Sequence, residues 1–331
     1  MGNSGNDRGK DQNSHSHGDG RTRRQGRRNP GRDVNGILLL DKPQGITSNK
    51  ALQLVKRLYN ARKAGHTGSL DPLATGLLPI CFGEATKISQ YLLDADKVYR
   101  ASCKLGVTTD SADADGNVVD IQAVNDIGAS EIEQALSQYR GEIEQIPPMH
   151  SALKQQGVPL YKLAHQGIEV ERAARTVNIH RLDFINFDEN VLEIEVQCSK
   201  GTYIRTLAED IGKSLGCGAH IVALRRLQAG PFNTRYMQTL DRLNERASEG
   251  EAELDSVLMP MESGLDGWPD VHLSEEAAFY LQQGQAVFVP NLQNNGYLKL
   301  YNNQSQFLGI GVMLDDGRVA PKRLMINTKM R

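Results

Sequence analysis

The alternation of apolar and polar residues predicts a chain that mixes helices and strands from about residue 34 onward. Residues 36–42 are almost continuously apolar, which indicates a short buried strand, and Pro43 ends it. Apolar residues then recur at helical spacing between 51 and 58, behind Thr47 or Ser48 as the helix cap. Further strands are predicted near residues 80–82, 98–107, 177–185, 191–198 and 221–227, and further helices near 84–93, 130–139 (opened by a Ser130–Glu133 capping box), 160–165, 202–215 and 236–258.

The pattern changes again after Pro260. One short helix from Ser274 to Gly284 is followed by short apolar runs that alternate with Asn-rich and Asp-Asp-Gly turns. These runs predict strands at residues 286–289, 297–301, 307–313 and from 319 onward. The C-terminal part of the chain is therefore predicted to be a small β module of about 60 residues.

The first 33 residues differ from everything after them. They consist largely of Gly, Asn, Ser, Asp and Arg with almost nothing to bury, so this tail is expected to be disordered. His15 and His17 lack further ligands beside them, and no metal site is predicted. The basic run at 21–28 fits either a contact with RNA phosphates or a solvated arm.

Length and charge limit the organisation further. The 331 residues have room for two ordinary domains, which we place at 34–255 and 256–331 after the tail at 1–33. The formal net charge is −2; the tail holds eight Lys/Arg and four Asp, so residues 34–331 carry −6. Composition alone therefore points away from a nucleic-acid partner.

The cysteines and the hydropathy pattern indicate the cellular compartment of the protein. Cys81, Cys103, Cys198 and Cys217 form no C-x-x-C pair and have no metal-ligand spacing, so they are expected to be reduced thiols. No apolar run approaches the roughly 18 residues that span a bilayer, and there is no apolar signal-peptide segment. These features predict a cytoplasmic protein without a membrane partner.

Residues 110–120 contain an acidic cluster. Asp113 and Asp115 resemble the centre of a calcium-binding EF-hand loop. The first and twelfth positions of that loop would be Ser111 and Gln122, although a bidentate Glu is needed at the twelfth. A hairpin or an ordinary loop is predicted instead.

One loop differs from the rest because a single acid lies in an apolar setting. Asp71 lies between Leu70 and Leu73, where partial desolvation raises the pKa of a carboxyl group unless a cation compensates. A lone carboxylate of this kind is a candidate nucleophile or general base, and its plain alternative is a turn or helix cap. Glycines and a proline shape the loop, which reads Gly65-His66-Thr67-Gly68-Ser69-Leu70-Asp71-Pro72-Leu73-Ala74-Thr75-Gly76.

Two familiar phosphate-binding loops do not fit this stretch. A P-loop needs Gly-Lys-Ser/Thr at its end, and no lysine lies between Lys63 and Lys87. The glycines also lack the spacing of a dinucleotide fingerprint. An acyl-phosphate transferase that uses Asp71 is therefore a weak possibility, because nothing convincingly binds nucleotide phosphates.

The Asp71 loop resembles the catalytic motif of the TruB family of tRNA pseudouridine synthases, which reads G-H-T-G-x-L-D-P-x-A-T-G. Separate segments at 38–45, 97–100 and 200–206 support the resemblance, which covers residues 34–331. It implies an α+β catalytic domain built on a mixed, mainly antiparallel sheet, the pseudouridine synthase fold, and a C-terminal RNA-binding PUA module shaped like a small β-barrel. It also implies isomerisation of uridine 55 in the T loop of tRNA without metal or small-molecule cofactor.

The resemblance assigns three catalytic residues. Asp71 corresponds to the essential aspartate, and Arg205 corresponds to an arginine that pairs with it. This pairing gives a reason for a cation in the first turn of a helix, where the helix dipole does not favour it. Tyr99 corresponds to a tyrosine that stacks on the flipped base and assists proton removal at C5. The plain alternatives are a surface arginine and an ordinary strand tyrosine.

Four further residues resemble substrate-binding positions. His66 corresponds to a histidine that enters the T loop and occupies the space that the uridine leaves. Tyr203 and Leu224 correspond to residues that line the uridine pocket, although simple core packing would also explain them. Lys42 corresponds to a lysine that orders the catalytic cleft, with a solvated loop lysine as the alternative.

RNA binding by an acidic chain requires its basic groups to cluster, and affinity should fall steeply with salt. Candidate phosphate contacts, about half of which are expected to be real, are Arg57, Arg62, Lys63, Arg100, Lys154, Arg172, Arg175, Arg225 and Arg226, with Lys322 and Arg323 in the C-terminal module.

The expected partner is the T-arm stem-loop of tRNA, and the expected state is a monomer. A second reading is a tRNA-binding or tRNA-folding protein whose catalysis is dispensable. Asp71→Asn separates the two, because it should abolish chemistry and spare binding.

Overall fold

The computed structural model describes residues 31–164, 166–290, 292 and 296–325. The expectations for most of the tail, including His15, His17 and the basic run at 21–28, concern residues outside this range.

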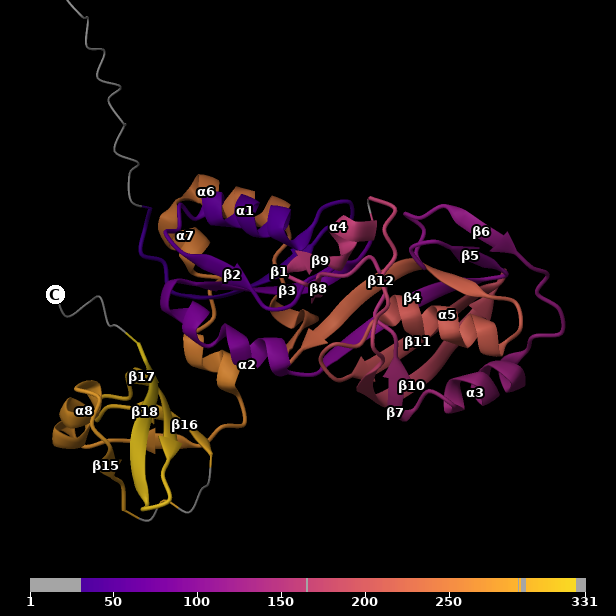
Figure 1. Ribbon diagram of the computed structural model, residues 1–331. Helices are drawn as coiled ribbons and strands as arrows, with labels where there is room; N and C mark the ends of the chain where they lie inside the picture. The colour runs from indigo at the N-terminus through magenta and orange to yellow at the C-terminus, as the bar shows by residue number, and fades with distance from the viewer. Residues whose placement is uncertain (1–30, 165, 291, 293–295, 326–331) are drawn as a thin grey trace, which may run out of the picture. The chain divides into compact units, whose positions relative to one another are not determined.

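The larger part of the chain is built on a nine-stranded mixed sheet (Figure 1). The main strand order is β1-β3-β12-β4-β11-β10-β7, with β2 on β3 and β13 on β12. Only the β3–β12 pair is parallel, so the predicted mixed and mainly antiparallel sheet is confirmed. The strands are β1 (Gly36–Lys42), β2 (Ala64–His66), β3 (Thr75–Phe82), β4 (Lys97–Leu105), β7 (Gly141–Gln145), β10 (Arg175–Asp188), β11 (Val191–Cys198), β12 (Ala219–Ala229) and β13 (Phe232–Asn233).

Helices and short elements connect these strands. The helices are α1 (Ser48–Leu58), α2 (Ser89–Asp94), α3 (Ala129–Ser137), α4 (Leu160–Ala164), α5 (Ile204–Ser214), α6 (Leu240–Glu249) and α7 (Glu251–Asp255). The 3-10 turns are η1 (Gly83–Lys87), η2 (Thr234–Tyr236) and η3 (Met261–Leu265), and two small hairpins pair β5 (Val107–Thr109) with β6 (Val118–Ile121) and β8 (Lys154–Gln155) with β9 (Val158–Pro159).

Most of the predicted elements are present, with two local corrections. The helix predicted at 84–93 is broken into η1 and α2 at Ile88, whose side chain is fully buried in the core. The capping box predicted for Ser130 and Glu133 is wrong. Glu131 instead accepts a hydrogen bond from the backbone N–H of Gly128 at 3.0 Å, and Glu133 pairs with Arg140. The predicted hairpin over 110–120 is confirmed by the β5–β6 pair.

The sheet is buried on both faces around β1 and β3 because their residues alternate between two apolar clusters. Leu38 and Leu40 face the main core, which also receives Leu70 from the Asp71 loop. Ile37 and Leu39 face a second cluster that includes α2 residues and Tyr301, Phe307 and Ile310 of the C-terminal part. This two-sided burial explains why residues 36–42 read as a continuous apolar run rather than an alternating one.

The C-terminal part is a five-stranded sheet with its own small core. Its strand order is β14-β16-β17-β18-β15. Ser274 caps α8 (Glu275–Gln282) as predicted from the sequence. The strands are β14 (Asp270–His272), β15 (Val287–Phe288), β16 (Tyr297–Tyr301), β17 (Phe307–Met313) and β18 (Arg318–Leu324), which confirms the predicted β module.

All four cysteines are buried free thiols. Among the described residues, every helix falls short of the length and apolarity that crossing a bilayer requires.

Candidate active site

The Asp71 loop connects β2 to β3 and is held by backbone and hydroxyl contacts. Ser48, at the start of α1, accepts a hydrogen bond from the N–H of Leu70 at 2.7 Å and donates to its carbonyl at 3.0 Å. The side chains of Leu70 and Leu73 are buried in the main core. Since both neighbours point inward, the loop holds the Asp71 carboxylate at the edge of the core.

Arg205 lies beside Asp71 as the sequence predicts. Its Nε is 3.0 Å from Oδ2 of Asp71; the Arg205 side chain is 6% exposed and the Asp71 side chain 41%. Burial raises the pKa of the Asp71 carboxyl, while the Arg205 charge and hydrogen bond act against that rise. The buried guanidinium thus favours the anionic form of Asp71, against burial, which favours the protonated form.

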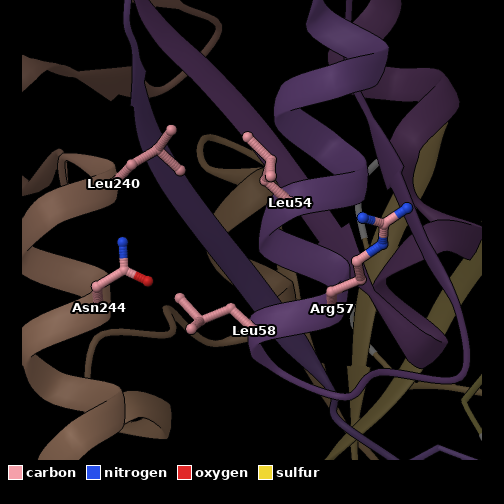
Figure 2. A pocket seen from close by; sticks show the side chains of 5 residues that line it. All are labelled: Leu54, Arg57, Leu58, Leu240 and Asn244. Carbon is pink, nitrogen blue, oxygen red and sulfur yellow. The ribbon is translucent and has the colours of Figure 1, made fainter.

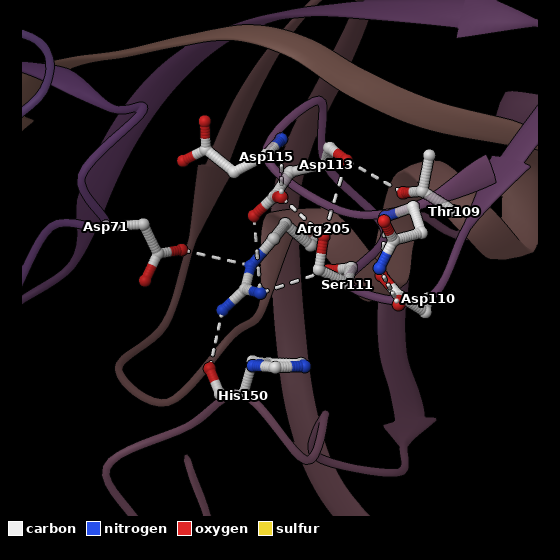
Figure 3. A network of polar contacts seen from close by, with 9 residues as sticks. Asp71, Thr109, Asp110, Ser111, Asp113, Asp115, His150 and Arg205 are labelled. Atoms are coloured by element: carbon white, nitrogen blue, oxygen red, sulfur yellow. Dashed lines mark hydrogen bonds and ion pairs between the residues drawn. The ribbon is translucent and has the colours of Figure 1, made fainter. Parts of the chain in front are cut away.

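Arg205 also binds two other loops (Figure 3). Its Nη1 donates to the carbonyl of Ser111 at 3.0 Å and lies 3.4 Å from Oδ2 of Asp113. Its Nη2 donates to the carbonyl of His150 at 2.7 Å. Because these donors are directed at fixed acceptors, the orientation of Arg205 toward Asp71 is predetermined.

Lys42 is fully buried next to the same loop. Its Nζ donates to the carbonyls of Pro43 at 2.9 Å, Ile46 at 2.7 Å and Pro72 at 3.5 Å. Burial lowers the pKa of Lys42 to about 8, and the negative charge of Asp71 partly offsets this. Lys42 therefore ties the strand that precedes α1 to the residue after Asp71, and the solvated-lysine alternative is excluded.

Tyr99 and Leu224 lie on neighbouring strands. Tyr99 on β4 is opposite Arg226 on β12, and Leu224 is opposite Ala101, so all four project from the same face of the sheet. Leu224 is buried in the main core, against which half-buried Tyr99 also packs. Burial raises the pKa of the Tyr99 hydroxyl, and the positive charge of Arg226 opposes the rise. The Asp71 charge also acts on this hydroxyl, which places Tyr99 near the carboxylate.

Tyr203 immediately precedes α5 and is fixed through its backbone. Its N–H donates to Oε1 of Gln145 at 3.0 Å, and Nε2 of Gln145 donates to its carbonyl at 3.2 Å. Burial raises the pKa of the Tyr203 hydroxyl, and the charges of Arg205 and Asp71 also act on it, so Tyr203 belongs to the same group of side chains.

His66 is the last residue of β2, at the start of the loop that carries Asp71. Its ring is half-buried, and its Nδ1 is buried without a hydrogen-bond partner among the described residues. Burial lowers the pKa of His66, and the nearby Arg226 charge lowers it further. A neutral imidazole with a spare polar atom is suited to a new contact, although the hydrogen bonds and ion pairs of the described residues include none between His66 and Asp71.

The sequence alone does not assign three residues of the site: Asp113, Gln145 and Arg226. It offers Asp113 only as a calcium ligand, although the Asp113 side chain is 7% exposed and faces Arg205. No sequence motif marks Gln145, because its partner atoms belong to the backbone of Tyr203. The prediction that Arg226 contacts phosphate is wrong, because the residue is 1% exposed. Arg226 lies two residues after the buried Leu224 on the same strand, so strand alternation indicates that its side chain also faces the core.

The other basic candidates differ in exposure. Arg57, Arg62, Lys63, Arg100, Lys154 and Arg175 are exposed, and Arg172 and Arg225 are partly buried. Arg225 pairs with Asp41 at 2.8 Å and Arg100 with Glu195 at 2.9 Å. Since Arg100 adjoins Tyr99 on a strand, it projects from the opposite face of the sheet.

A groove of about 360 Å³ lies between α1 and α6, lined by Leu54, Arg57, Leu58, Leu240 and Asn244 (Figure 2). None of the residues around Asp71 lines it, so it is not part of the site. Among the described residues, no cluster of three or more His, Cys, Asp or Glu side chains has the arrangement of a metal site.

Family models match almost the whole described chain. Residues 56–204 match the N-terminal domain of TruB family pseudouridylate synthases, 205–266 match the tRNA pseudouridylate synthase B C-terminal domain, and 269–325 match the C-terminal region of pseudouridine synthase II TruB. The tRNA pseudouridine synthase B of Pseudomonas paraeruginosa is 55% identical over 295 residues, which is 89% of this chain and 97% of that protein. The chain belongs to the TruB family of pseudouridylate synthases.

Further similarities agree with membership of the TruB family. The tRNA pseudouridine synthase B of Nitrosococcus oceani is 53% identical over 301 residues, covering 91% of this chain and 98% of that protein. A chain in the crystal structure of a Cbf5-Nop10-Gar1 complex aligns with a TM-score of 0.67 at 27% identity, covering 85% of this chain and 79% of that one. The predicted pseudouridine synthase fold is therefore confirmed, and the chain is an isomerase of the TruB type.

Proposed function

We propose that this TruB family enzyme converts uridine 55 in the T loop of tRNA to pseudouridine, with Asp71 as the essential carboxylate. The observation that carries the proposal is the Asp71 carboxylate held 3.0 Å from a buried Arg205 at the end of an apolar loop. The full-length relatives named tRNA pseudouridine synthase B support tRNA as the substrate.

The reaction sets three demands on the protein. The N1–C1′ bond breaks, the base rotates, and a C5–C1′ bond forms while the C5 proton leaves; neither oxidation nor net hydrolysis takes place. A carboxylate must therefore reach C1′, C6 or a sugar proton, water must be kept from the intermediate, and the base must leave its stack. Asp71 supplies the carboxylate in any of these three routes, and each route requires its ionised form.

Arg205 stabilises the ionised form of Asp71 and fixes the direction of its carboxylate. With its other donors on Ser111, Asp113 and His150, the guanidinium presents Nε to Asp71 without first having to reorganise. Asp113 is a positioning residue in this scheme, because it anchors Arg205 and is itself held by the Ser111 hydroxyl at 2.5 Å.

The remaining residues form the base pocket. Tyr99 stacks on the flipped uracil and its hydroxyl serves proton removal at C5, while Tyr203 and Leu224 line the pocket. Lys42 orders the pocket rather than transferring a proton, since three carbonyls hold its ammonium group. His66 occupies the space that the uridine leaves. Stacking of its ring on a neighbouring base contributes roughly 1–3 kcal/mol, which offsets much of the few kcal/mol that base flipping costs.

The T-arm stem-loop is proposed to bind as a duplex and loop across exposed basic residues near α1 and the Asp71 loop, such as Arg62 and Lys63. We further propose residues 34–255 as the catalytic domain and 256–331 as a PUA-like clamp on the tRNA. The enzyme is proposed to act as a monomer in the cytoplasm, where its substrate is, and without a cofactor.

The deciding experiment measures tritium release from a T-arm stem-loop with [5-³H]uridine at the target position, without added metal or nucleotide. Wild type should release tritium and Asp71→Asn should not, although both bind the stem-loop. The control Asp188→Asn changes an exposed carboxylate and should behave as wild type. If wild type and Asp71→Asn both bind tightly and neither releases tritium, the protein is a tRNA-binding or folding factor instead.

A further inference from the structure

Arg226 is one of the largest fully buried side chains among the described residues, with 1% of its surface exposed. A buried guanidinium normally has a carboxylate partner, because removing a charge from water is costly. None of the ion pairs between described residues involves Arg226. The position of this cation therefore requires an explanation that structural ion pairing does not provide.

The hydrogen bonds of Arg226 are with the catalytic loop and with β3, the strand that follows it. Its Nε donates to the carbonyl of Leu77 on β3 at 2.7 Å, and its Nη2 donates to the carbonyl of Gly68 at 3.1 Å. Its side chain projects from the same face of the sheet as that of Tyr99, the residue opposite it on β4, and its positive charge acts on the Tyr99 hydroxyl. One rigid planar group thus holds the loop that carries Asp71 and lies beside Tyr99.

The chemistry of the two groups sets the direction of any hydrogen bond between them. A guanidinium has donors only, so the Tyr99 oxygen would accept from Arg226. The hydroxyl hydrogen of Tyr99 would then be directed elsewhere, with a lone pair committed to Arg226. Such a bond would fix which way the phenol can exchange a proton.

Two glycines of the loop motif lie against Arg226, and Gly76 in particular leaves no space for a side chain. A Cβ on Gly76 would lie 2.4 Å from the carbonyl oxygen of Arg226 and 2.9 Å from its nitrogen. A Cβ on Gly68 would lie 3.5 Å from Nη1 of Arg226. The backbone and the side chain of Arg226 therefore both fit against the loop, one on each side of Asp71.

We propose that Arg226 is a positioning residue that donates a hydrogen bond to the Tyr99 hydroxyl, fixing the phenol oxygen relative to the Gly68 carbonyl and hence to Asp71 for proton removal at C5. The proposal rests on the function proposed above. The positive charge of Arg226 supports this positioning role, because it counters the rise in the Tyr99 pKa that burial causes. A lysine would keep the charge but has no fork that reaches Leu77, Gly68 and Tyr99 at once.

The test is a double-mutant cycle of Arg226→Lys and Tyr99→Phe, read by single-turnover tritium release with enzyme in excess. Arg226→Lys should slow release at least tenfold in wild type and less than about threefold in the Tyr99→Phe background. Equal losses in the two backgrounds would overturn the proposal, because a purely structural role does not depend on the phenol. Arg181→Lys, at an exposed position of β10, is the matched control and should have no effect.

A second readout is independent of catalysis and separates this proposal from the proposed function. In protein with ¹³C-labelled tyrosine, the Tyr99 signal, identified by its loss in Tyr99→Phe, should titrate at higher pH in Arg226→Gln. An unmoved Tyr99 titration would overturn the positioning role, even if Arg226→Lys failed to fold. Absence of tritium release by wild type would instead overturn the proposed reaction, whatever the Tyr99 signal does.

Discussion

The Nε of Arg205 lies 3.0 Å from Oδ2 of Asp71, but that contact uses only one of its donors. The others bind the Ser111 and His150 carbonyls and approach Asp113. Arg205 is thus the point at which three loops from distant parts of the chain meet. The ionised state of Asp71 and its position both depend on this arrangement.

Arg205→Lys is predicted to slow product formation by roughly 100-fold, because an ammonium on a flexible stem cannot bind three loops and Asp71 together. Binding of the stem-loop should change far less. Single-turnover tritium release and a binding titration measure the two effects separately. Arg246→Lys, whose partner is the exposed Glu253, is the control. A variant with nearly wild-type release would show that a point charge near Asp71 is enough.

The pH dependence of the rate should have an acid limb set by Asp71. Burial raises the pKa of this carboxyl, so the rate falls as pH drops through that raised value and the reactive anion is lost. Arg205→Gln removes the compensating cation and should move the limb to higher pH. Asp113→Asn removes a repelling charge and should move it to lower pH. An upward shift in Asp113→Asn would mean that Asp113 acts mainly by holding Arg205.

Sequence patterns predicted the elements well where burial follows a simple period. The alternation in 191–198 and the helical spacing after 202 correspond to β11 and α5, and the motif around Asp71 correctly indicated Arg205 as its neighbour. Ile88 was missed as a helix break because its side chain turns toward a tertiary core that local spacing does not encode.

The supporting part of the site was less predictable for a physical reason. Arg205 and Gln145 bind backbone atoms of His150 and Tyr203, and any residue type provides such atoms. Arg226 illustrates a different failure, because composition cannot distinguish a buried arginine from a solvated one. Strand alternation with Leu224 does distinguish them once β12 is assigned.

Gly76→Ala is predicted to destabilise the protein by about 3 kcal/mol or more, since its φ is +97° and its Cβ would lie 2.4 Å from the Arg226 carbonyl oxygen. Gly284→Ala is the matched control, with φ of +86° and no atom within 4 Å, so only the backbone strain of about 1–2 kcal/mol applies. Urea denaturation midpoints give both values. Equal losses would mean that β3 and β12 can separate at little cost.

The affinity for the T-arm stem-loop should fall steeply with salt, with log K declining linearly against log salt concentration. Arg62→Ala should reduce that slope by about 1, because the exposed side chain is proposed to neutralise one phosphate. Arg181→Ala should leave the slope unchanged, because Arg181 pairs with Glu195, which lies opposite Arg100 on the face away from Tyr99. Binding that is flat between low and physiological salt would contradict phosphate contacts altogether.

Gln145→Glu tests whether the turn before α5 must be fixed for the reaction. The substitution keeps the shape but replaces the donor to the Tyr203 carbonyl with an oxygen, at a side chain that is 2% exposed. Loss of this bond and the resulting repulsion should cost about 2–3 kcal/mol of stability. Because Tyr203 is two residues from Arg205, displacement of the turn should also slow tritium release. The control Gln228→Glu changes an exposed hydrogen bond to the Gly230 carbonyl and should neither lower stability nor slow tritium release. An unimpaired rate in Gln145→Glu would show that Arg205 is positioned by its own contacts alone.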